Sequence, residues 1–485
     1  MKKIIYIAIL LLTTASCSDW LDATSDNTSV TDKKFFEDEN SFYNALIDIY
    51  TQLREPELYG DNLSVGMLEF MGQNFVPADQ VTKEYSNFDY KAIENRGTLS
   101  TIWREMYRAI SSTNKLIKEI ENTDVVFYNE GQKEIITGEA YALRGALHFE
   151  LLRLFHPSFK ENPNYTALPY MTEFGTSVSA PQSTTELISR ITKDLEHAAE
   201  LLKPNDPILT GISLISITPG EIDSRLRTFE LNYYAVTALL ARVALYEGNY
   251  TKAFQYADET FNHTRNIETR SQVFYYFTPG KYGADFSFSR EHIFGIASPP
   301  DGLTEVAETM FEDKKIKTRT GLRQIFPVAS DIRYRAWFNA ADNNEYVMSG
   351  KFSKESLLID YNKTTGGETA SLPVRIPFIK LGEVALIAAE SLNETDSPDK
   401  AAQWLIDMQT TKGASYVAEL QQNGKLDKET VRQAIADEYA REFWGEGQLF
   451  FFHKRLNHKQ ISAYDGSVIE MNDTKYTLPV PDNAL

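Results

Sequence analysis

Apolar residues recur every three or four positions along most of the chain, which is the spacing of helices that bury one face. The segments with this spacing, which we predict to be helices, are Phe35–Leu53, Leu99–Ile120, Ile135–Phe155, Ser183–Leu202, Arg227–Glu247, Thr251–Phe261, Leu381–Leu392, Asp399–Met408 and Lys428–Phe443. A short apolar run such as His292–Ile296 fits a strand instead. We therefore predict a mainly α-helical fold with a few short strands.

Two adjacent helix pairs resemble tetratricopeptide repeats, in which small residues let two helices pack closely across a short turn. In the first pair, near residues 227–263, Gly248 marks the turn and Ala253 lies in the second helix. The second pair, near residues 381–410, carries Ala389 in its first helix. No repeat period runs along the whole chain, so we expect these pairs to be part of one fold rather than of a uniform solenoid.

Long stretches without helical spacing separate the helices, and loops of this length are uncommon in compact domains unless they serve a function. They are Met71–Gly97, Pro157–Thr185, Lys203–Ser224, Thr264–Arg290, Ala297–Ile325 and Asn339–Pro373. Aromatic rings in such loops suit sugars, because a ring stacks on the apolar face of a sugar. The candidate ligand-binding residues are Phe75, Tyr85, Phe88, Tyr90, Tyr275, Tyr276, Tyr282 and Phe286.

The first residues have the pattern of a secretory signal peptide. Two lysines precede the apolar run Ile4–Leu12, which is too short to span a bilayer, and small residues follow it. We expect residues 1–16 to be removed. Cys17 is the only cysteine, so it has no partner for an internal disulfide. Its position resembles a bacterial lipobox, in which the cysteine is lipidated, although that motif usually has Leu where this chain has Thr14.

The composition is that of a folded protein with an acidic surface. The 49 basic and 68 acidic residues give a net charge of −19, which disfavours a nucleic-acid partner. Aromatic residues make up 12% of the chain, with 26 Tyr and 28 Phe but only 5 Trp. The two aromatic loops contain no Trp, so a ligand other than a glycan stays open.

The sequence contains none of the common catalytic or cofactor motifs. The phosphate loops G-x-x-x-x-G-K and G-x-G-x-x-G, the nucleophile elbow G-x-S-x-G and the zinc motif H-E-x-x-H are all missing. His453 and His458 are five residues apart and do not share one helical face. The polar run 342–345 lacks the glycine of a calcium loop. We predict no catalytic residue, no metal site and no cofactor.

One ordered group of carboxylates needs an explanation. Glu438, Glu442 and Glu446 follow one another at four-residue steps, so they lie on the same side of a helix. A glycosidase needs two carboxylates that face each other across a cleft, roughly 5 to 9 Å apart. We interpret these residues instead as ion-pair partners of Arg441 and Arg455 that hold the last helix in place.

Several segments in order along the chain resemble the SusD/RagB family of nutrient-binding outer-membrane lipoproteins. They are Cys17–Asp22, Phe35-Phe36 with Ala45–Tyr50, Trp103–Tyr107 with Asn114–Ile117, Glu139–Phe155, Asp331–Arg333, Ile376–Glu390, Glu438–Arg455 and Tyr476–Pro481, the last resembling a closing strand. The family commonly has Arg and Asp where this chain has Leu449 and Phe452.

The resemblance implies one SusD-like domain over residues 17–485, built from about four tetratricopeptide-like helical pairs with long loop insertions. It also implies a lipid-anchored protein on the cell-surface side of the outer membrane. Such proteins cover a TonB-dependent, SusC-like β-barrel transporter and pass it an oligosaccharide, a polysaccharide or, in some members, a peptide.

Two other functions compete with this interpretation. An exported hydrolase on a lipid anchor would need two facing carboxylates or a metal cluster, and the sequence offers neither. A helical scaffold that binds only protein partners would need no ligand surface, which the long aromatic loops mildly oppose.

Overall fold

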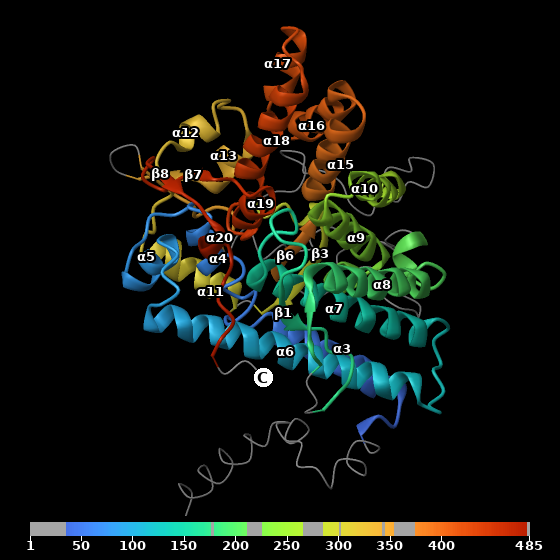
Figure 1. Ribbon diagram of the computed structural model, residues 1–485. Helices are drawn as coiled ribbons and strands as arrows, with labels where there is room; N and C mark the ends of the chain where they lie inside the picture. Colours follow the sequence, from blue (N-terminus) through green and yellow to red (C-terminus); the bar gives the residue numbers. More distant parts are fainter. Residues whose placement is uncertain are drawn as a thin grey trace, which may run out of the picture.

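Long helices stacked side by side form the frame of the protein (Figure 1). The computed structural model describes residues 35–175, 179–210, 226–264, 285–299, 302–341, 345–353 and 374–482. Cys17 and the predicted signal peptide lie outside these residues.

The first half of the chain supplies α3 (Glu39–Leu53), α6 (Ile93–Glu121), α7 (Gln132–Phe155) and α8 (Thr184–Leu202). Helix α6 packs against α3 and α7, and α7 packs against α8. In Figure 1 these helices form the lower part of the molecule.

The stack continues upward through α9 (Tyr233–Glu247) and α10 (Tyr250–Thr264) to α15 (Leu381–Thr395) and α16 (Pro398–Thr411) (Figure 1). Each of these helices packs on the next, and α18 (Lys428–Glu442) packs against α15. The predicted mainly helical fold is therefore confirmed. None of the helices in the described ranges has an apolar stretch long enough to cross a bilayer.

Side-chain caps explain where several long helices begin. Asp38 caps α3 together with Ser41, and Ser183 caps α8 together with Glu186. Helix α9 starts at Tyr233, later than the predicted Arg227, because Asn232 caps it and Arg227 lies in a preceding 3₁₀ turn. Gly248 ends α9 at φ 81°, a left-handed conformation that suits glycine.

Parts of the predicted loops are short helices. Helices α4 (Met67–Met71) and α5 (Gln80–Ser86) lie before α6, which itself begins six residues before the predicted Leu99. The other short helices are α11 (Leu303–Glu308), α12 (Leu322–Ile325), α13 (Ile332–Trp337), α17 (Tyr416–Gln422), α19 (Gln448–Leu456) and α20 (Asp473–Tyr476). The 3₁₀ helices are η1 (Pro207–Thr210), η2 (Leu226–Phe229) and η4 (Ser289–Glu291), and η5 (Thr309–Asp313) is a π-helical turn. Every residue of α4 is buried, so packing on all sides hides the one-sided spacing that identifies a longer helix.

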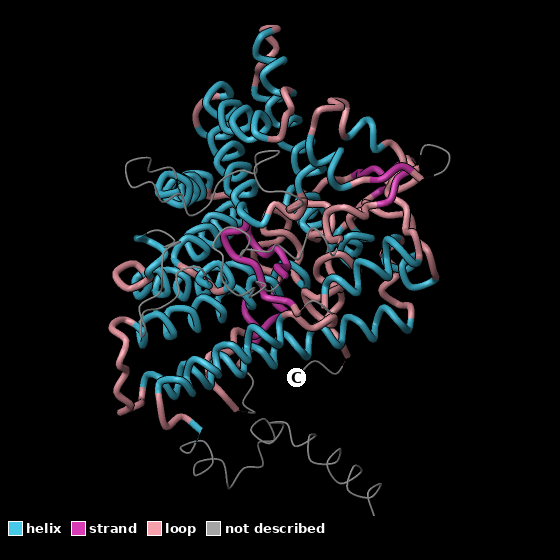
Figure 2. The backbone as a smooth tube through the Cα atoms, turned by 180° about the vertical axis from the view of Figure 1, so that it is seen from behind, coloured by secondary structure: helices cyan, strands magenta, loops and turns pink. Residues whose placement is uncertain are grey.

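The strands form two-stranded antiparallel pairs, some near the middle of the helical frame and some at its edge (Figure 2). The pairs are β1 (Thr166–Pro169) with β2 (Pro181–Ser183), β3 (His292–Ser298) with β6 (Val374–Lys380), β4 (Asn339–Ala340) with β5 (Tyr346–Val347), and β7 (Gln460–Ser462) with β8 (Val468–Glu470). The predicted strand at His292–Ile296 is confirmed as β3.

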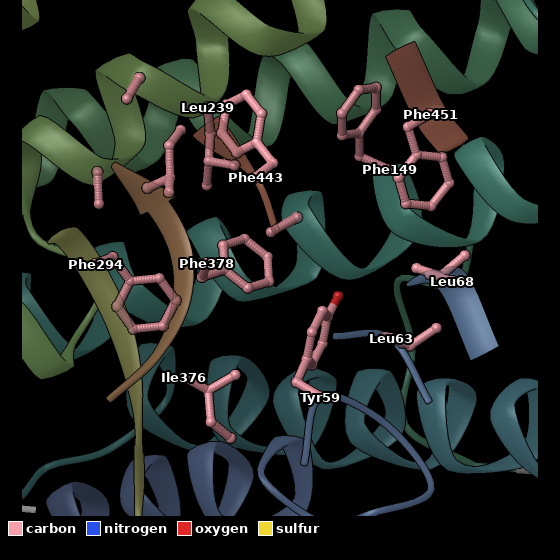
Figure 3. Close-up of a cluster of buried hydrophobic side chains, with 14 of the residues drawn as sticks. Tyr59, Leu63, Leu68, Phe149, Leu239, Phe294, Ile376, Phe378, Phe443 and Phe451 are labelled. Atoms are coloured by element: carbon pink, nitrogen blue, oxygen red, sulfur yellow. The ribbon is translucent and has the colours of Figure 1, made fainter. Parts of the chain in front are cut away.

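The pair β3–β6 contributes aromatic rings to the core between the helices (Figure 3). The rings of Phe294 and Phe378 lie 5.3 Å apart, and Tyr59 packs edge-on against Phe378 at 5.1 Å. These contacts join the two strands to the segment that precedes α4.

The predicted closing strand at Tyr476–Pro481 is wrong. Tyr476 ends α20, Thr477 forms a bend, and residues 478–481 have no regular secondary structure. Pro479 and Pro481 have no N–H to offer a sheet, and the Leu478 N–H donates instead to the Leu154 carbonyl at the end of α7 (3.1 Å).

The carboxylates of α18 are locked in a buried ionic network. Arg333, which is fully buried, binds Asp331 at 2.7 Å and Glu442 at 2.8 Å, and it also binds Glu438. Arg441 binds Glu438 at 2.8 Å, as predicted. None of these carboxylates faces a partner across an open cleft, which opposes their use as a glycosidase pair.

Arg455 does not join this group, which corrects the sequence interpretation. Arg455 binds Glu390 of α15 at 2.6 Å, whereas Glu446 binds Lys380 at 2.7 Å and also Lys351. At one position where the family has a polar residue, the Phe452 ring stacks on Tyr439 with ring centres 4.2 Å apart. An apolar contact thus takes the place of an ion pair there.

Candidate ligand-binding cleft

A cleft of about 1120 Å³ opens where three segments distant in sequence meet. Its walls are residues 90–100 at the start of α6, residues 157–165 after α7, and residues 473–482 near the end of the chain. The volume is slightly larger than that of most small-molecule sites.

Hydrogen bonds hold the three walls together. The Tyr90 hydroxyl donates to the Lys475 carbonyl (2.5 Å), which ties the first wall to α20. The Leu478 N–H and the Lys454 ammonium (3.0 Å) both donate to the Leu154 carbonyl, which ties the end of α7 to the C-terminal segment. Burial lowers the pKa of Lys454 well below its usual value.

The α6 wall of the cleft is open at Gly97. A Cβ atom placed on Gly97 would meet no heavy atom within 4 Å, so the space beside this helix turn is free. One turn earlier, the Ile93 side chain is 77% exposed on the same wall. An exposed isoleucine beside an open glycine provides an apolar surface on which a ligand can lie.

Polar groups surround this apolar surface. Lys91 and Arg96 supply positive charge from the α6 side, and Asp473 and Asp482 supply negative charge from the C-terminal side. The Thr477 hydroxyl is buried and has no hydrogen-bond partner among the described residues. A ligand rich in hydroxyl groups would satisfy donors and acceptors of this kind.

Two tyrosines line the cleft, and of these only Tyr165 is partly exposed. Tyr165 is half-buried and packs edge-on against His156 (4.9 Å between ring centres). Tyr90 is 8% exposed, and burial raises the pKa of its hydroxyl well above the usual value, so the hydroxyl keeps its proton. The cleft can therefore bind by contact and hydrogen bonding, and its lining lacks cysteine and histidine as nucleophile or base.

Three of the predicted ligand-binding aromatics belong to the core, which corrects their assignment. Phe75 has no exposed surface and packs against Phe311 and Trp444. Tyr85 and Phe88 are each 7% exposed. Because the short helices α4 and α5 fold this segment inward, these rings have no free face for a sugar.

The other predicted aromatics have different outcomes. Tyr90 is the one that lines the cleft. Phe286 is half-buried, and its carbonyl accepts a hydrogen bond from the Trp337 indole (2.7 Å), outside the cleft. Tyr275, Tyr276 and Tyr282 lie outside the described residues.

A second aromatic surface lies away from the cleft. Tyr334 and Tyr346 are both partly exposed, their hydroxyls are 2.9 Å apart, and Arg323 lies over the Tyr334 ring (4.7 Å). Sequence reasoning missed this pair because its members come from α13 and β5, which are short elements inside or beside predicted loops.

The described residues contain no group of three or more His, Cys, Asp or Glu side chains placed to hold a metal ion. His453 and His458, the nearest histidine pair in the sequence, bind each other through their Nδ1 atoms (2.9 Å). Burial lowers the pKa of His453 to about 3, so both rings are neutral at pH 7 and one donates to the other.

Two family models match the chain one after the other. The model described as "Starch-binding associating with outer membrane" matches residues 19–213, and the model described as "SusD family" matches residues 243–483. The matches do not overlap, and together they span most of the chain. The chain belongs to the SusD family.

Solved SusD structures share the fold at low sequence identity. A SusD superfamily protein from Bacteroides thetaiotaomicron has a TM-score of 0.68 at 20% identity, over 92% of this chain and 97% of the other. One from Bacteroides vulgatus has a TM-score of 0.69 at 19% identity, over 93% and 97%. A protein from Bacteroides vulgatus described as SusD-like and carbohydrate binding has a TM-score of 0.64 at 20% identity, over 88% and 85%.

No curated protein matches this SusD-family chain significantly. The family nevertheless defines its general role, because SusD-family proteins are nutrient-binding lipoproteins associated with the outer membrane and are not enzymes. The chain is thus a carbohydrate- or nutrient-binding protein at the level of its family.

Proposed function

We propose that this protein is lipid-anchored through Cys17 on the outer face of the outer membrane and captures an oligosaccharide or polysaccharide in the cleft beside α6. It then passes the ligand to a SusC-like, TonB-dependent β-barrel. The observation that carries the proposal is the open α6 wall, where Gly97 leaves space next to exposed Ile93. A carbohydrate-binding protein of the same fold supports a glycan ligand.

The chemistry of the cleft supports binding rather than catalysis. Charged groups of both signs lie beside an apolar wall, together with a buried Thr477 hydroxyl that has no partner in the described part of the chain. Such a surface suits hydroxyl-rich chains that have apolar C–H faces. The glutamates of α18 that resemble an acid pair are already bound to Arg333 and Arg441. A peptide or another non-glycan ligand is the alternative, and a scaffold without a small ligand is the second alternative.

The test of the ligand class is a binding panel. The soluble chain without Cys17, residues 18–485, is run in gels that contain different polysaccharides and is titrated calorimetrically with oligosaccharides and oligopeptides. Saturable binding to one glycan class supports the proposal, and binding to oligopeptides alone replaces it with the peptide alternative. Binding to neither overturns capture by the isolated chain.

The same panel locates the site. Tyr346→Ala removes one ring of the second aromatic surface and leaves the cleft intact, because Tyr346 does not line the cleft. We expect this variant to bind like the wild type. If Tyr346→Ala loses binding, the ligand site is the Tyr334–Tyr346 surface and not the cleft.

A further inference from the structure

A small second pocket lies between α3, α7 and η2, apart from the ligand-binding cleft. Its volume is about 210 Å³, and Tyr43 of α3, Gln132 of α7 and Glu230 after η2 are among its walls. It shares no lining residue with the cleft beside α6. Occupation of this pocket therefore does not depend on where the nutrient binds.

Negative groups outnumber positive groups at this pocket. Arg227 is fully buried at its base and binds Glu139, Glu230 and Asp206, the last at 2.9 Å. One guanidinium thus meets three carboxylates. Asp206 does not line the pocket, so the lining has three carboxylates, Glu39, Glu139 and Glu230, against one guanidinium. Glu39 accepts hydrogen bonds from the Tyr128 N–H and the Asn129 amide (both 2.8 Å).

Among the described residues that line the pocket, Gln132 has a buried polar atom without a partner. Gln132 is 8% exposed, and its side-chain carbonyl oxygen is buried without a hydrogen bond to any described residue. A buried acceptor left unpaired costs about 1 to 3 kcal/mol, which a hydrogen-bond donor from a ligand would offset. An unpaired acceptor beside an excess of carboxylates is complementary to a ligand that donates hydrogen bonds and carries positive charge.

The shape of the pocket selects an organic cation over a metal ion. Leu46, Ile135 and Ile136 give the pocket an apolar side that suits an aliphatic stem. Among the described residues no three carboxylates or histidines converge closely enough to bind a metal. A primary ammonium has three donors that can reach acceptors in different directions, whereas a guanidinium is flat.

We propose that this pocket binds the ammonium group of a lysine side chain presented by a protein or peptide partner. The segment that carries rim residue Asn129 also exposes Val126 (69%) and Tyr128 (90%), which offer apolar surface for the rest of such a partner. The net charge of −19 attracts basic partners over a distance.

A proton competes with the ammonium for this pocket. Burial raises the pKa of Glu139 to about 8. The positive charge of Arg227 lowers this pKa, and the negative charge of Glu230 raises it. The other groups that face this cluster are Asp206 on Arg227 and the hydroxyls of Tyr43 and Tyr50, which donate to Glu230 and Glu139. A bound ammonium favours ionised Glu139, so affinity rises as the pH increases toward 8 and falls in acid.

The experiment uses Nα-acetyl-lysine amide as the probe and Nα-acetyl-norleucine amide as its uncharged isostere. Both are titrated into the soluble chain of residues 18–485, with binding followed by saturation-transfer NMR. Gln132→Met removes the unpaired acceptor at nearly constant shape, and Gln182→Met is the matched control, since Gln182 also has an unpaired oxygen but lies in β2 outside the pocket.

We expect saturable binding of the lysine probe, at least tenfold weaker binding of the norleucine probe, and about tenfold weaker lysine binding by Gln132→Met. Gln182→Met binds like the wild type, and thermal unfolding confirms that both variants fold. The proposal is overturned by absent lysine binding, by equal binding of the two probes, or by an unchanged affinity in Gln132→Met.

Discussion

His148 in α7 is a buried side chain whose two ring nitrogens are both in use. Its Nδ1 lies 2.8 Å from the Arg144 carbonyl, and its Nε2 accepts a hydrogen bond from the Met171 N–H (2.9 Å). A carbonyl only accepts and an N–H only donates, so this pair of contacts fits one neutral tautomer. Burial accordingly lowers the pKa of His148 to about 4.

The lowered pKa gives stability a defined pH dependence. Between pH 6.5 and 4 the unfolded chain binds a proton at this residue and the folded chain does not, so the free energy of unfolding falls as the pH falls. From pH 6.5 to 5 the loss amounts to about 2 kcal/mol for this one group. His148→Gln should therefore be less sensitive to acid than the wild type, as measured by urea unfolding at pH 7 and pH 5.

The matched control is His197→Gln, because the His197 side chain is 44% exposed. This variant should keep the pH dependence of the wild type. If His148→Gln and the wild type lose equal stability between pH 7 and pH 5, His148 does not titrate as described.

The identity of single binding residues was the least predictable feature of the sequence. An aromatic residue in a loop has the same sequence appearance whether its ring is buried, like Phe75, or lines a cleft, like Tyr90. Gly97 gave no signal, because its importance comes from the empty space beside it, which depends on segments about 60 and 380 residues away.

Capping at the start of α8 is a property of a whole element. The Ser183 hydroxyl accepts from the Glu186 N–H (3.3 Å), and the Glu186 carboxylate accepts from the Ser183 N–H (2.8 Å). Ser183→Ala removes the first bond and leaves a donor of the first turn unpaired. We expect a loss of about 1 kcal/mol in the free energy of unfolding, measured by urea denaturation.

Ser415→Ala is the comparison for this capping effect. Ser415 precedes α17, but its side chain makes no capping hydrogen bond to the helix backbone. The loss should be smaller than for Ser183→Ala. An equal loss in the two variants would contradict the capping explanation.

Long elements were predictable from the sequence and short ones were not. A helix such as α8 buries one face over five turns, so its spacing is visible in one dimension. A helix such as α4 has five residues that are all buried, and its hydrophobic run has no period to read. The first turns of α6 were missed because Ile93 is exposed and Asn95 is buried there, which breaks the apolar pattern.

The proposed membrane anchor concerns the whole molecule. Cys17 follows the predicted signal peptide, and lipid on this residue would attach the protein to the outer membrane. Cys17→Ser should release the protein from the membrane fraction of expressing cells, and mass spectrometry of the wild type should find acyl chains on Cys17. Membrane retention of the variant without any acyl chain would contradict lipid anchoring.

We also predict that the whole protein associates with a transporter. Mild-detergent purification of the intact lipoprotein from its native membrane should recover a SusC-like β-barrel, identified by mass spectrometry. If the protein is recovered without any β-barrel from cells that capture the ligand, the predicted partnership with a transporter is contradicted.

The fold and the family could be predicted from sequence signatures spread along the chain, because the residues of these signatures make the contacts that hold the helical frame together. The Asp331–Arg333 element, for example, holds α13 to α18 through Glu438 and Glu442. The ligand could not be predicted in the same way. The cleft combines three segments that carry no shared pattern, and its chemistry arises only when they meet.

The most direct test of the account is ligand binding by two variants of Gly97. Gly97→Ala adds one carbon to an exposed helical position and should stabilise α6 by about 0.5 to 1 kcal/mol without closing the cleft. Gly97→Leu places a bulky aliphatic chain beside Ile93, inside the cleft. Calorimetric titration with the best ligand of the panel should give wild-type affinity for Gly97→Ala and at least tenfold weaker binding for Gly97→Leu. Equal affinity in both variants would contradict capture in this cleft.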